Sequence, residues 1–133
     1  MRYVVGIDSG GTKTVGLRAD ETGQVLAKAR GGGANLVIHG ELAVEKVLYQ
    51  VIEDLESPGP LAAICLGMAG VDRPEEKELI QVLLRRLGLR KNIRIVNDAL
   101  IALVAGAPEG MGIVVSAGTG SIAYGVDPGG ETA

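Results

Sequence analysis

The sequence contains no phenylalanine and no tryptophan, and its three tyrosines are the only aromatic residues. Because 47% of its 133 residues are hydrophobic, the core must be built from valine, leucine, isoleucine and alanine. Nucleic-acid-binding modules use basic surfaces and aromatic stacking platforms. This chain has a net charge of −3 and neither feature, so we expect no nucleic-acid partner.

Cysteine and histidine occur once each, as Cys65 and His39. A single cysteine cannot form an intrachain disulfide, and together these two residues supply too few ligands for a structural zinc site. Cys65 lies in an apolar run, so we expect it to be a buried strand residue. We expect His39 at the surface, where a helix begins.

Long hydrophobic runs are also missing, because no apolar stretch reaches the roughly 18 residues of a membrane span. Met1 and Arg2 lead directly into a strand-like segment, without the pattern of a signal peptide. We therefore expect no membrane partner and a cytoplasmic location.

Glycine, in contrast, is abundant, with 21 residues that gather in clusters. Such clusters occur where the backbone turns tightly or approaches a ligand closely. They lie at residues 10–11, 31–33, 118–120 and 129–130. We interpret the last of these as an ordinary loop.

Three strands are predicted at the start of the chain, from short apolar or alternating runs separated by turns. They cover residues 2–8, 13–19 and 24–29. Strands joined by such short turns form an antiparallel meander.

Two amphipathic helices, with a buried strand between them, are predicted after the meander. Apolar residues recur on one helical face from Val44 to Leu55, and a Ser-Pro-Gly-Pro segment ends this helix. The apolar run 61–66 predicts a strand covered on both faces. Asp72 is predicted to cap the second helix, with Glu75 in capping-box register.

A further strand at 93–96 and a short apolar helix at 99–105 complete the order βββαβαβα. The pattern then restarts. A strand at 111–116, a Gly-Thr-Gly turn and a strand at 121–126 repeat the strand–turn–strand arrangement at the start of the chain. We therefore predict a first lobe over residues 1–108 and the beginning of a second lobe over 109–133.

The first glycine turn combines groups that suit a phosphate. Residues 6–14 differ from a Walker A loop, because Thr12 precedes Lys13 and a strand follows in place of a helix. Consecutive N–H groups in a tight turn still converge on phosphate oxygens, and Thr12 and Lys13 add a hydroxyl and a cation. Asp8 has two open interpretations: a carboxylate for hydrated Mg²⁺, or a turn residue bonded to its own backbone.

Three segments together resemble the actin-like ATPase superfamily. Residues 8–14 are similar to its first phosphate loop, residues 117–121 to its second, and residues 97–99 to the catalytic-aspartate segment of its sugar kinases. Within the superfamily, the chain resembles the BadF/BadG/BcrA/BcrD family, which includes N-acetylglucosamine kinases. The resemblance implies an α/β fold: a ribonuclease H-like lobe followed by the first hairpin of a second, truncated lobe.

The resemblance also implies roles, with ATP and Mg²⁺ as cofactors and a sugar as substrate. Asp8 would hold Mg²⁺ through water, and Asp98 would act as base toward a sugar hydroxyl. Asn35 and Gly70 would contact the sugar. The phosphates of ATP would be bound by Gly10, Gly11, Thr12 and Lys13 from one lobe and by Gly118, Thr119 and Gly120 from the other.

Ordinary structural roles remain open for two of these residues. Asp98 begins a predicted helix, where aspartate is a favoured N-cap, and one residue can serve both purposes. Asn35 has the alternative of a polar turn residue.

The predicted function is the N-terminal part of an ATP-dependent kinase for N-acetylglucosamine or a related amino sugar. Two alternatives are an ATPase that activates a dehydratase and a non-catalytic nucleotide-binding half. The first of these needs thiolates for an iron–sulfur cluster, and the only cysteine lies in a predicted strand. Because the chain stops inside the second lobe, we expect it to be inactive alone, and to pair its exposed strand edges as a homodimer.

Overall fold

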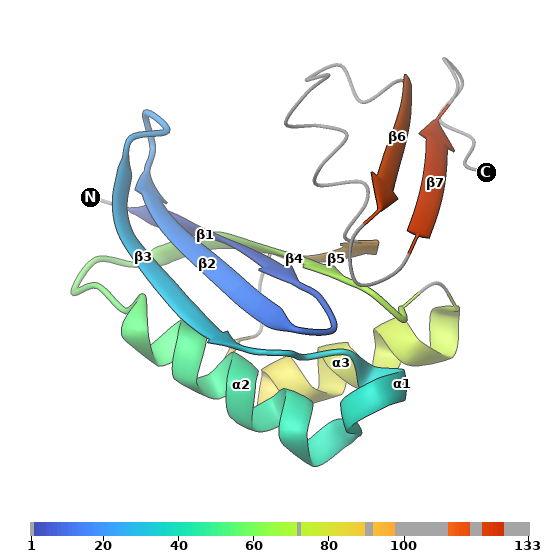
Figure 1. Cartoon of the computed structure of the whole chain (residues 1–133). Helices are drawn as coiled ribbons and strands as arrows, with labels where there is room; N and C mark the ends of the chain where they lie inside the picture. The colour runs from blue at the N-terminus through green and yellow to red at the C-terminus, as the bar shows by residue number, and fades with distance from the viewer. Residues whose placement is uncertain (1, 72, 90–91, 98–111, 118–120, 127–133) are drawn as a thin grey trace.

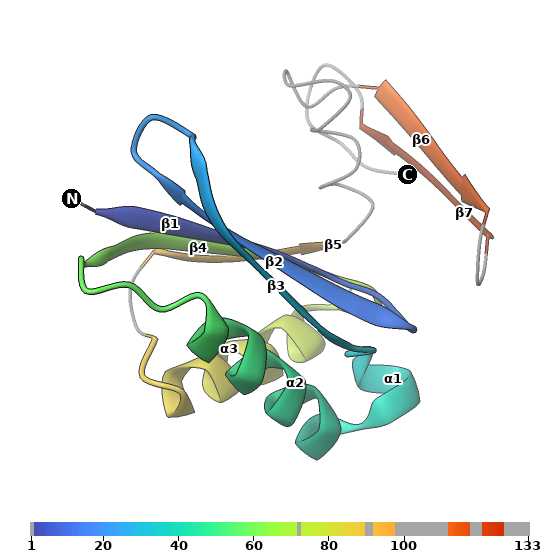
Figure 2. The ribbon, with the colours of Figure 1, turned by 60° about the vertical axis from the view of Figure 1, so that its left-hand side comes forward.

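The computed structural model describes residues 2–71, 73–89, 92–97, 112–117 and 121–126, with side chains described up to Asn97. Five strands form one mixed sheet in the order β3-β2-β1-β4-β5, and two more form a separate hairpin. The strands of the sheet are β1 Tyr3–Ser9, β2 Lys13–Asp20, β3 Val25–Gly32, β4 Leu61–Met68 and β5 Ile93–Asn97. The hairpin pairs β6 Gly112–Ala117 with β7 Ser121–Val126. The helices are α1 Leu36–His39, α2 Glu41–Asp54 and α3 Pro74–Arg86, and all three lie on the same face of the sheet (Figures 1 and 2).

The pairing of β1 decides where the ends of the strands meet. This strand is antiparallel to β2 and parallel to β4, and β5 is parallel to β4. The carboxyl ends of β1, β4 and β5 therefore lie at one edge of the sheet, which we call the phosphate edge. Their amino ends lie at the opposite edge, which we call the distal edge.

The core lies between the sheet and the helices α2 and α3. In α2, Val44, Leu48 and Val51 are fully buried at the spacing of one helical face. Burying a leucine side chain such as that of Leu48 contributes about 1.5–3 kcal/mol. Gly16 of β2 lets α2 approach closely, because a Cβ there would lie 2.7 Å from the Leu55 side chain.

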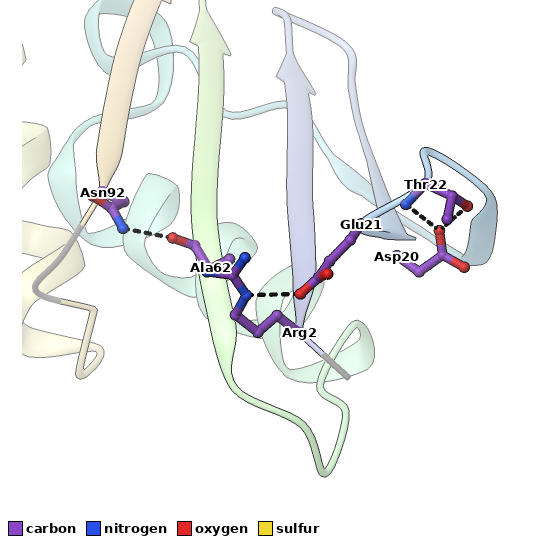
Figure 3. A network of polar contacts seen from close by, with 6 residues as sticks. All are labelled: Arg2, Asp20, Glu21, Thr22, Ala62 and Asn92. Atoms are coloured by element: carbon purple, nitrogen blue, oxygen red, sulfur yellow. Dashed lines mark hydrogen bonds and ion pairs between the residues drawn. The ribbon is translucent and has the colours of Figure 1, made fainter.

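Hydrogen bonds made by side chains in its own turns stabilise the distal edge (Figure 3). The Asp20 carboxylate accepts hydrogen bonds from the N–H and the hydroxyl of Thr22 and from the N–H of Gln24. Asn92, at a φ of 52°, donates from Nδ2 to the carbonyl oxygen of Ala62 at 2.7 Å. Asparagine tolerates this left-handed backbone conformation better than most residues.

The predicted meander, the helical face of α2 and both strands of the hairpin are confirmed. The predicted strand after α2 is confirmed as β4, but it is not covered on both faces, because Ala63 and Cys65 are only partly buried. The third strand is longer than predicted, because β3 continues through Gly31 and Gly32. A Cβ at Gly31 would lie 3.1 Å from both Val47 and Val51, so this glycine gives α2 room to approach. The short helix α1 was not predicted, and the predicted helix at 99–105 lies outside the described residues.

Two smaller predictions need correction. The N-cap of α3 is Arg73, so the prediction of Asp72 as the cap was wrong by one residue; Asp72 itself lies outside the described residues. Arg73 is extended because it precedes Pro74, which occupies the first helical turn. Cys65 does lie in a strand, but it is only partly buried. Burial raises the pKa of its thiol above the ordinary value.

Among the described helices, none has the length and apolar character needed to cross a bilayer.

Candidate active site

The turn between β1 and β2 is held mainly by backbone contacts. Within it, the Gly10 N–H donates to the Lys13 carbonyl oxygen at 2.9 Å. From outside it, the N–H of Ala34 donates to the carbonyl oxygen of Gly10 at 3.0 Å. In the described part of the chain, the N–H groups of Gly11 and Thr12 have no hydrogen-bond partner. The turn thus keeps two adjacent donors for a ligand, as the sequence predicts for a phosphate loop.

Two buried hydroxyl groups connect this turn to the end of β3. The Ser9 hydroxyl donates to the Ala34 carbonyl oxygen at 2.9 Å, and the Thr14 hydroxyl donates to the Gly32 carbonyl oxygen at 2.8 Å. Their oxygens are 3.2 Å apart. Each hydroxyl has one proton, so these two donations leave no proton for a bond between the hydroxyls. Both side chains are completely buried, which makes loss of either bond costly.

Gly33 brings the end of β3 into direct contact with residues 10–12, between β1 and β2, which we call the phosphate turn after its predicted ligand. A Cβ at this position would lie 2.3 Å from the carbonyl oxygen of Gly11 and 2.7 Å from Cε1 of His39. No side chain fits there, so only glycine permits this approach. Within the glycine cluster at 31–33, Gly31 and Gly33 therefore serve close packing, whereas a Cβ at Gly32 would meet no atom within 4 Å.

Asn35 and Gly70, the two predicted sugar-binding residues, lie against each other. Asn35 precedes α1, and its Oδ1 accepts hydrogen bonds from the N–H groups of Val37 and Ile38. A Cβ at Gly70 would lie 3.1 Å from this Oδ1. The alternative of a turn residue is therefore confirmed for Asn35, because its side chain caps α1, and its contact with a sugar stays a prediction. Since Oδ1 faces the cap, the amide NH₂ is left to donate, and no described residue accepts from it.

The loop that carries Gly70 is bonded to β1. The N–H of Ala69 donates to the carbonyl oxygen of Ser9 at 3.2 Å. Because Ala34 also bonds to Gly10, the phosphate turn, the Asn35 segment and the Gly70 loop meet at the phosphate edge. Figure 1 shows α1 beside the turn between β1 and β2.

Asp8 and Lys13 flank the turn, and both are exposed. Asp8 alternates with the buried residues Ile7 and Ser9, so its carboxylate lies on the sheet face opposite the helices. Exposed carboxylate oxygen at this edge suits a hydrated Mg²⁺. No cluster of three or more metal-ligating side chains occurs among the residues that the structure describes.

The remaining predicted site residues lie outside the described residues: Asp98, Gly118, Thr119 and Gly120. Their neighbours are described. Asn97 ends β5 at the phosphate edge, paired with Met68 of β4. The hairpin closes through the pair Ala117 and Ser121, on either side of the second predicted phosphate loop.

Sequence reasoning gave no individual role in this site to four residues that shape it: Ser9, Thr14, Gly33 and His39. Ser9 and Thr14 flank the glycine turn at the inward-facing positions of their strands, which is the one signal that could have found them. His39 was predicted as a surface residue and is partly buried, with its ring against Gly33.

A family model described as the BadF/BadG/BcrA/BcrD ATPase family matches residues 5–133. The chain belongs to this family. It is 40% identical, over 140 aligned residues, to the N-acetylmuramic acid/N-acetylglucosamine kinase of Clostridium acetobutylicum. It is 35% identical, over 135 aligned residues, to the N-acetyl-D-glucosamine kinase of Dictyostelium discoideum.

These alignments cover 100% and 91% of the chain but 45% and 42% of the two relatives. The chain thus spans less than half the length of the curated relatives it matches. Among solved structures, a ROK family glucokinase from Streptomyces griseus in complex with glucose and AMPPNP superimposes with a TM-score of 0.69. The match covers 98% of this chain and 46% of that one, at 19% identity. This likeness shows the fold, and it agrees with the predicted α/β fold class.

Proposed function

We propose that this chain supplies the N-terminal half of an ATP-dependent kinase that phosphorylates a hydroxyl of N-acetylglucosamine or a related amino sugar. The observation that carries the proposal is the meeting of three segments at the phosphate edge. The turn at Gly10, the Asn35 segment and the Gly70 loop are joined by direct backbone hydrogen bonds. The names of the curated relatives support the substrate class.

Phosphoryl transfer depends chiefly on positioning and on neutralising charge, and the phosphate turn can do both. The N–H groups of Gly11 and Thr12 would bind the β- and γ-phosphates of ATP, with Lys13 adding positive charge. Gly118, Thr119 and Gly120 would approach the same phosphates from the second lobe. Asp8 would hold Mg²⁺ through water, and the bound metal would neutralise phosphate charge.

At the sugar, Asn35 would act as a hydrogen-bond donor, because its Oδ1 is already used by the cap of α1. Gly70, at a φ of 79°, would offer its backbone beside Asn35. Asp98 would accept the proton of the reacting hydroxyl, which a carboxylate within hydrogen-bond reach can do late in the transfer.

The dehydratase-activating alternative is not proposed. It needs cysteine thiolates, and Cys65 is a partly buried strand residue whose burial disfavours the thiolate.

The test is phosphorylation of a panel of sugars by ATP and Mg²⁺, using the full-length protein and its Asp98→Asn variant. We expect ADP release that depends on an amino sugar and that falls by at least about a hundredfold in Asp98→Asn. Asp54→Asn is the matched control, because Asp54 is an exposed residue of α2 that bonds only Gln50 and should leave activity unchanged. ATP hydrolysis that is independent of sugar and of Asp98 would overturn the proposal.

Asn35 gives a second, finer test. Asn35→Asp keeps an oxygen that can cap α1 but removes the NH₂ donor. We therefore expect a normal melting temperature and a sugar KM at least about tenfold higher, with the KM for ATP little changed. An unchanged sugar KM would show that Asn35 is only a cap.

A further inference from the structure

The short helix α1 persists although it has only four residues. Isolated helical segments of this length are unstable in water, so contacts at its ends must hold it. At its start, Asn35 Oδ1 accepts from two backbone N–H groups. At its end, the N–H of His39 donates to the Asn35 carbonyl oxygen at 2.8 Å, and Gly40 follows at a φ of 81°.

The His39 ring also stabilises this turn, through a hydrogen bond with the backbone of Asn35. Its Nδ1 accepts a hydrogen bond from the N–H of Asn35 at 3.1 Å. An imidazole nitrogen that accepts cannot carry a proton, so the neutral ring must be protonated at Nε2. Nδ1 is also 3.3 Å from the Asn35 carbonyl oxygen, to which it could donate only in the other tautomer or when charged.

The same ring also packs against Gly33, at the end of β3. Its Cε1 lies over Gly33, where a Cβ would be 2.7 Å away, and Gly33 in turn contacts the carbonyl oxygen of Gly11. His39 therefore contacts both sides of the candidate site: the backbone of the sugar-binding asparagine and the packing that supports the phosphate turn.

We propose that His39 is a positioning residue, which fixes the Asn35 backbone relative to the phosphate turn through the Nε2-protonated tautomer. This inference rests on the proposed sugar kinase function. His39 itself does not touch the substrate. Its effect is to keep the amide of Asn35 aimed at the sugar, because a small displacement of a positioning group weakens binding and slows reaction.

The kinetic test compares His39→Leu with His39→Asn in the full-length protein. Leucine fills space without an acceptor, whereas the Oδ1 of asparagine stands at about the same place as the imidazole Nδ1. We expect the sugar KM to rise about tenfold in His39→Leu, more than the KM for ATP rises, and to return to within about threefold of wild type in His39→Asn. Equal changes in both KM values, or no rescue by asparagine, would overturn the proposal.

A spectroscopic test does not depend on kinetics or on a variant that folds poorly. Nitrogen-15 NMR of the wild-type imidazole, assigned through the signal lost in His39→Asn, reports which nitrogen carries the proton. We expect Nε2 to be protonated and Nδ1 to be the acceptor. Protonation at Nδ1 in the neutral ring would overturn the inference, whatever the reaction catalysed. A wild-type protein that phosphorylates no sugar would instead overturn the proposed function.

Discussion

Two turns of the same antiparallel meander are built in opposite ways. The turn between β2 and β3, at the distal edge, is satisfied by its own side chain, because Asp20 accepts from Thr22 and Gln24. The turn between β1 and β2, at the phosphate edge, is held from outside by Ala34 and keeps two N–H groups unused. A turn whose N–H groups bond to its own side chain is stabilised from within and has none to offer a ligand. A turn that is held by neighbouring segments can leave its N–H groups available to a ligand.

The comparison predicts its largest effect at Gly33. In Gly33→Ala, the new Cβ would meet the Gly11 carbonyl oxygen at 2.3 Å, so the phosphate turn must move. We expect kcat/KM for ATP in the full-length protein to fall by about a hundredfold, because displacements near 1 Å have effects of that size. Steady-state kinetics at varied ATP would measure it.

Gly23→Ala is the matched control at the distal turn. Gly23 has a φ of 89° and open space around its Cβ position, so alanine there adds only backbone strain. We expect a loss of about 1–2 kcal/mol in the free energy of unfolding and an unchanged kcat/KM. Equal activity of the Gly33→Ala and wild-type proteins would contradict the difference between the two turns.

A moderate effect is expected from the buried hydroxyl of Ser9. Ser9→Ala leaves the Ala34 carbonyl oxygen without its donor, which should lower the free energy of unfolding by about 1–3 kcal/mol. Thr22→Ala at the distal turn also removes a hydroxyl donor, but this side chain is exposed and water replaces it. Denaturant unfolding of both variants should therefore show the larger loss in Ser9→Ala. A larger loss of stability in Thr22→Ala than in Ser9→Ala would contradict this difference between the two turns.

The smallest effect concerns pH and the distal turn. Hydrogen bonds, first of all from the Thr22 hydroxyl, lower the pKa of Asp20 below its ordinary value of 3.8. A lowered pKa in the folded state means that Asp20 stabilises the fold above pH 3.8, and that this contribution is lost as the pH falls through the folded-state value. The melting temperature of Asp20→Asn should therefore differ from wild type more at pH 7 than at pH 2.5.

The melting temperatures of wild type and Asp20→Asn should be measured side by side across this pH range. A constant difference between Asp20→Asn and wild type would show that the Asp20 carboxylate is not what titrates.

Patterns in the sequence were sufficient to predict the strands of the meander and the helix α2. A short run of strand-forming residues identified β1, alternation identified β2, and the helical repeat from Val44 to Leu55 identified α2. The start of α3 was misplaced by one residue, since Pro74 makes the preceding residue the N-cap whatever its side chain. The four-residue α1 has too few residues to show any repeat.

The predicted site residues were found through the resemblance of short motifs, and in the structure the turn between β1 and β2, Asn35 and Gly70 lie close together. The residues that hold this turn and Asn35 in place could not be predicted from short motifs. Gly33 and His39 act through contacts with Gly11 and Asn35 that depend on how β3 and α1 pack at the phosphate edge. A single sequence carries no direct signal for such contacts.

The pairing of β1 with β4 also has a consequence for folding order. Gly6 pairs with Cys65, about sixty residues later, whereas the turns of the meander join strands that are adjacent in the chain. Closing the longer loop costs more entropy, so we expect the meander to form first. At ribosomal rates of about 5–20 residues per second, the edge of β1 that pairs with β4 stays unpaired for about 3 to 12 seconds, until β4 has been synthesised. The part of the candidate site built from Ser9, Ala34 and Ala69 therefore forms only when β4 docks.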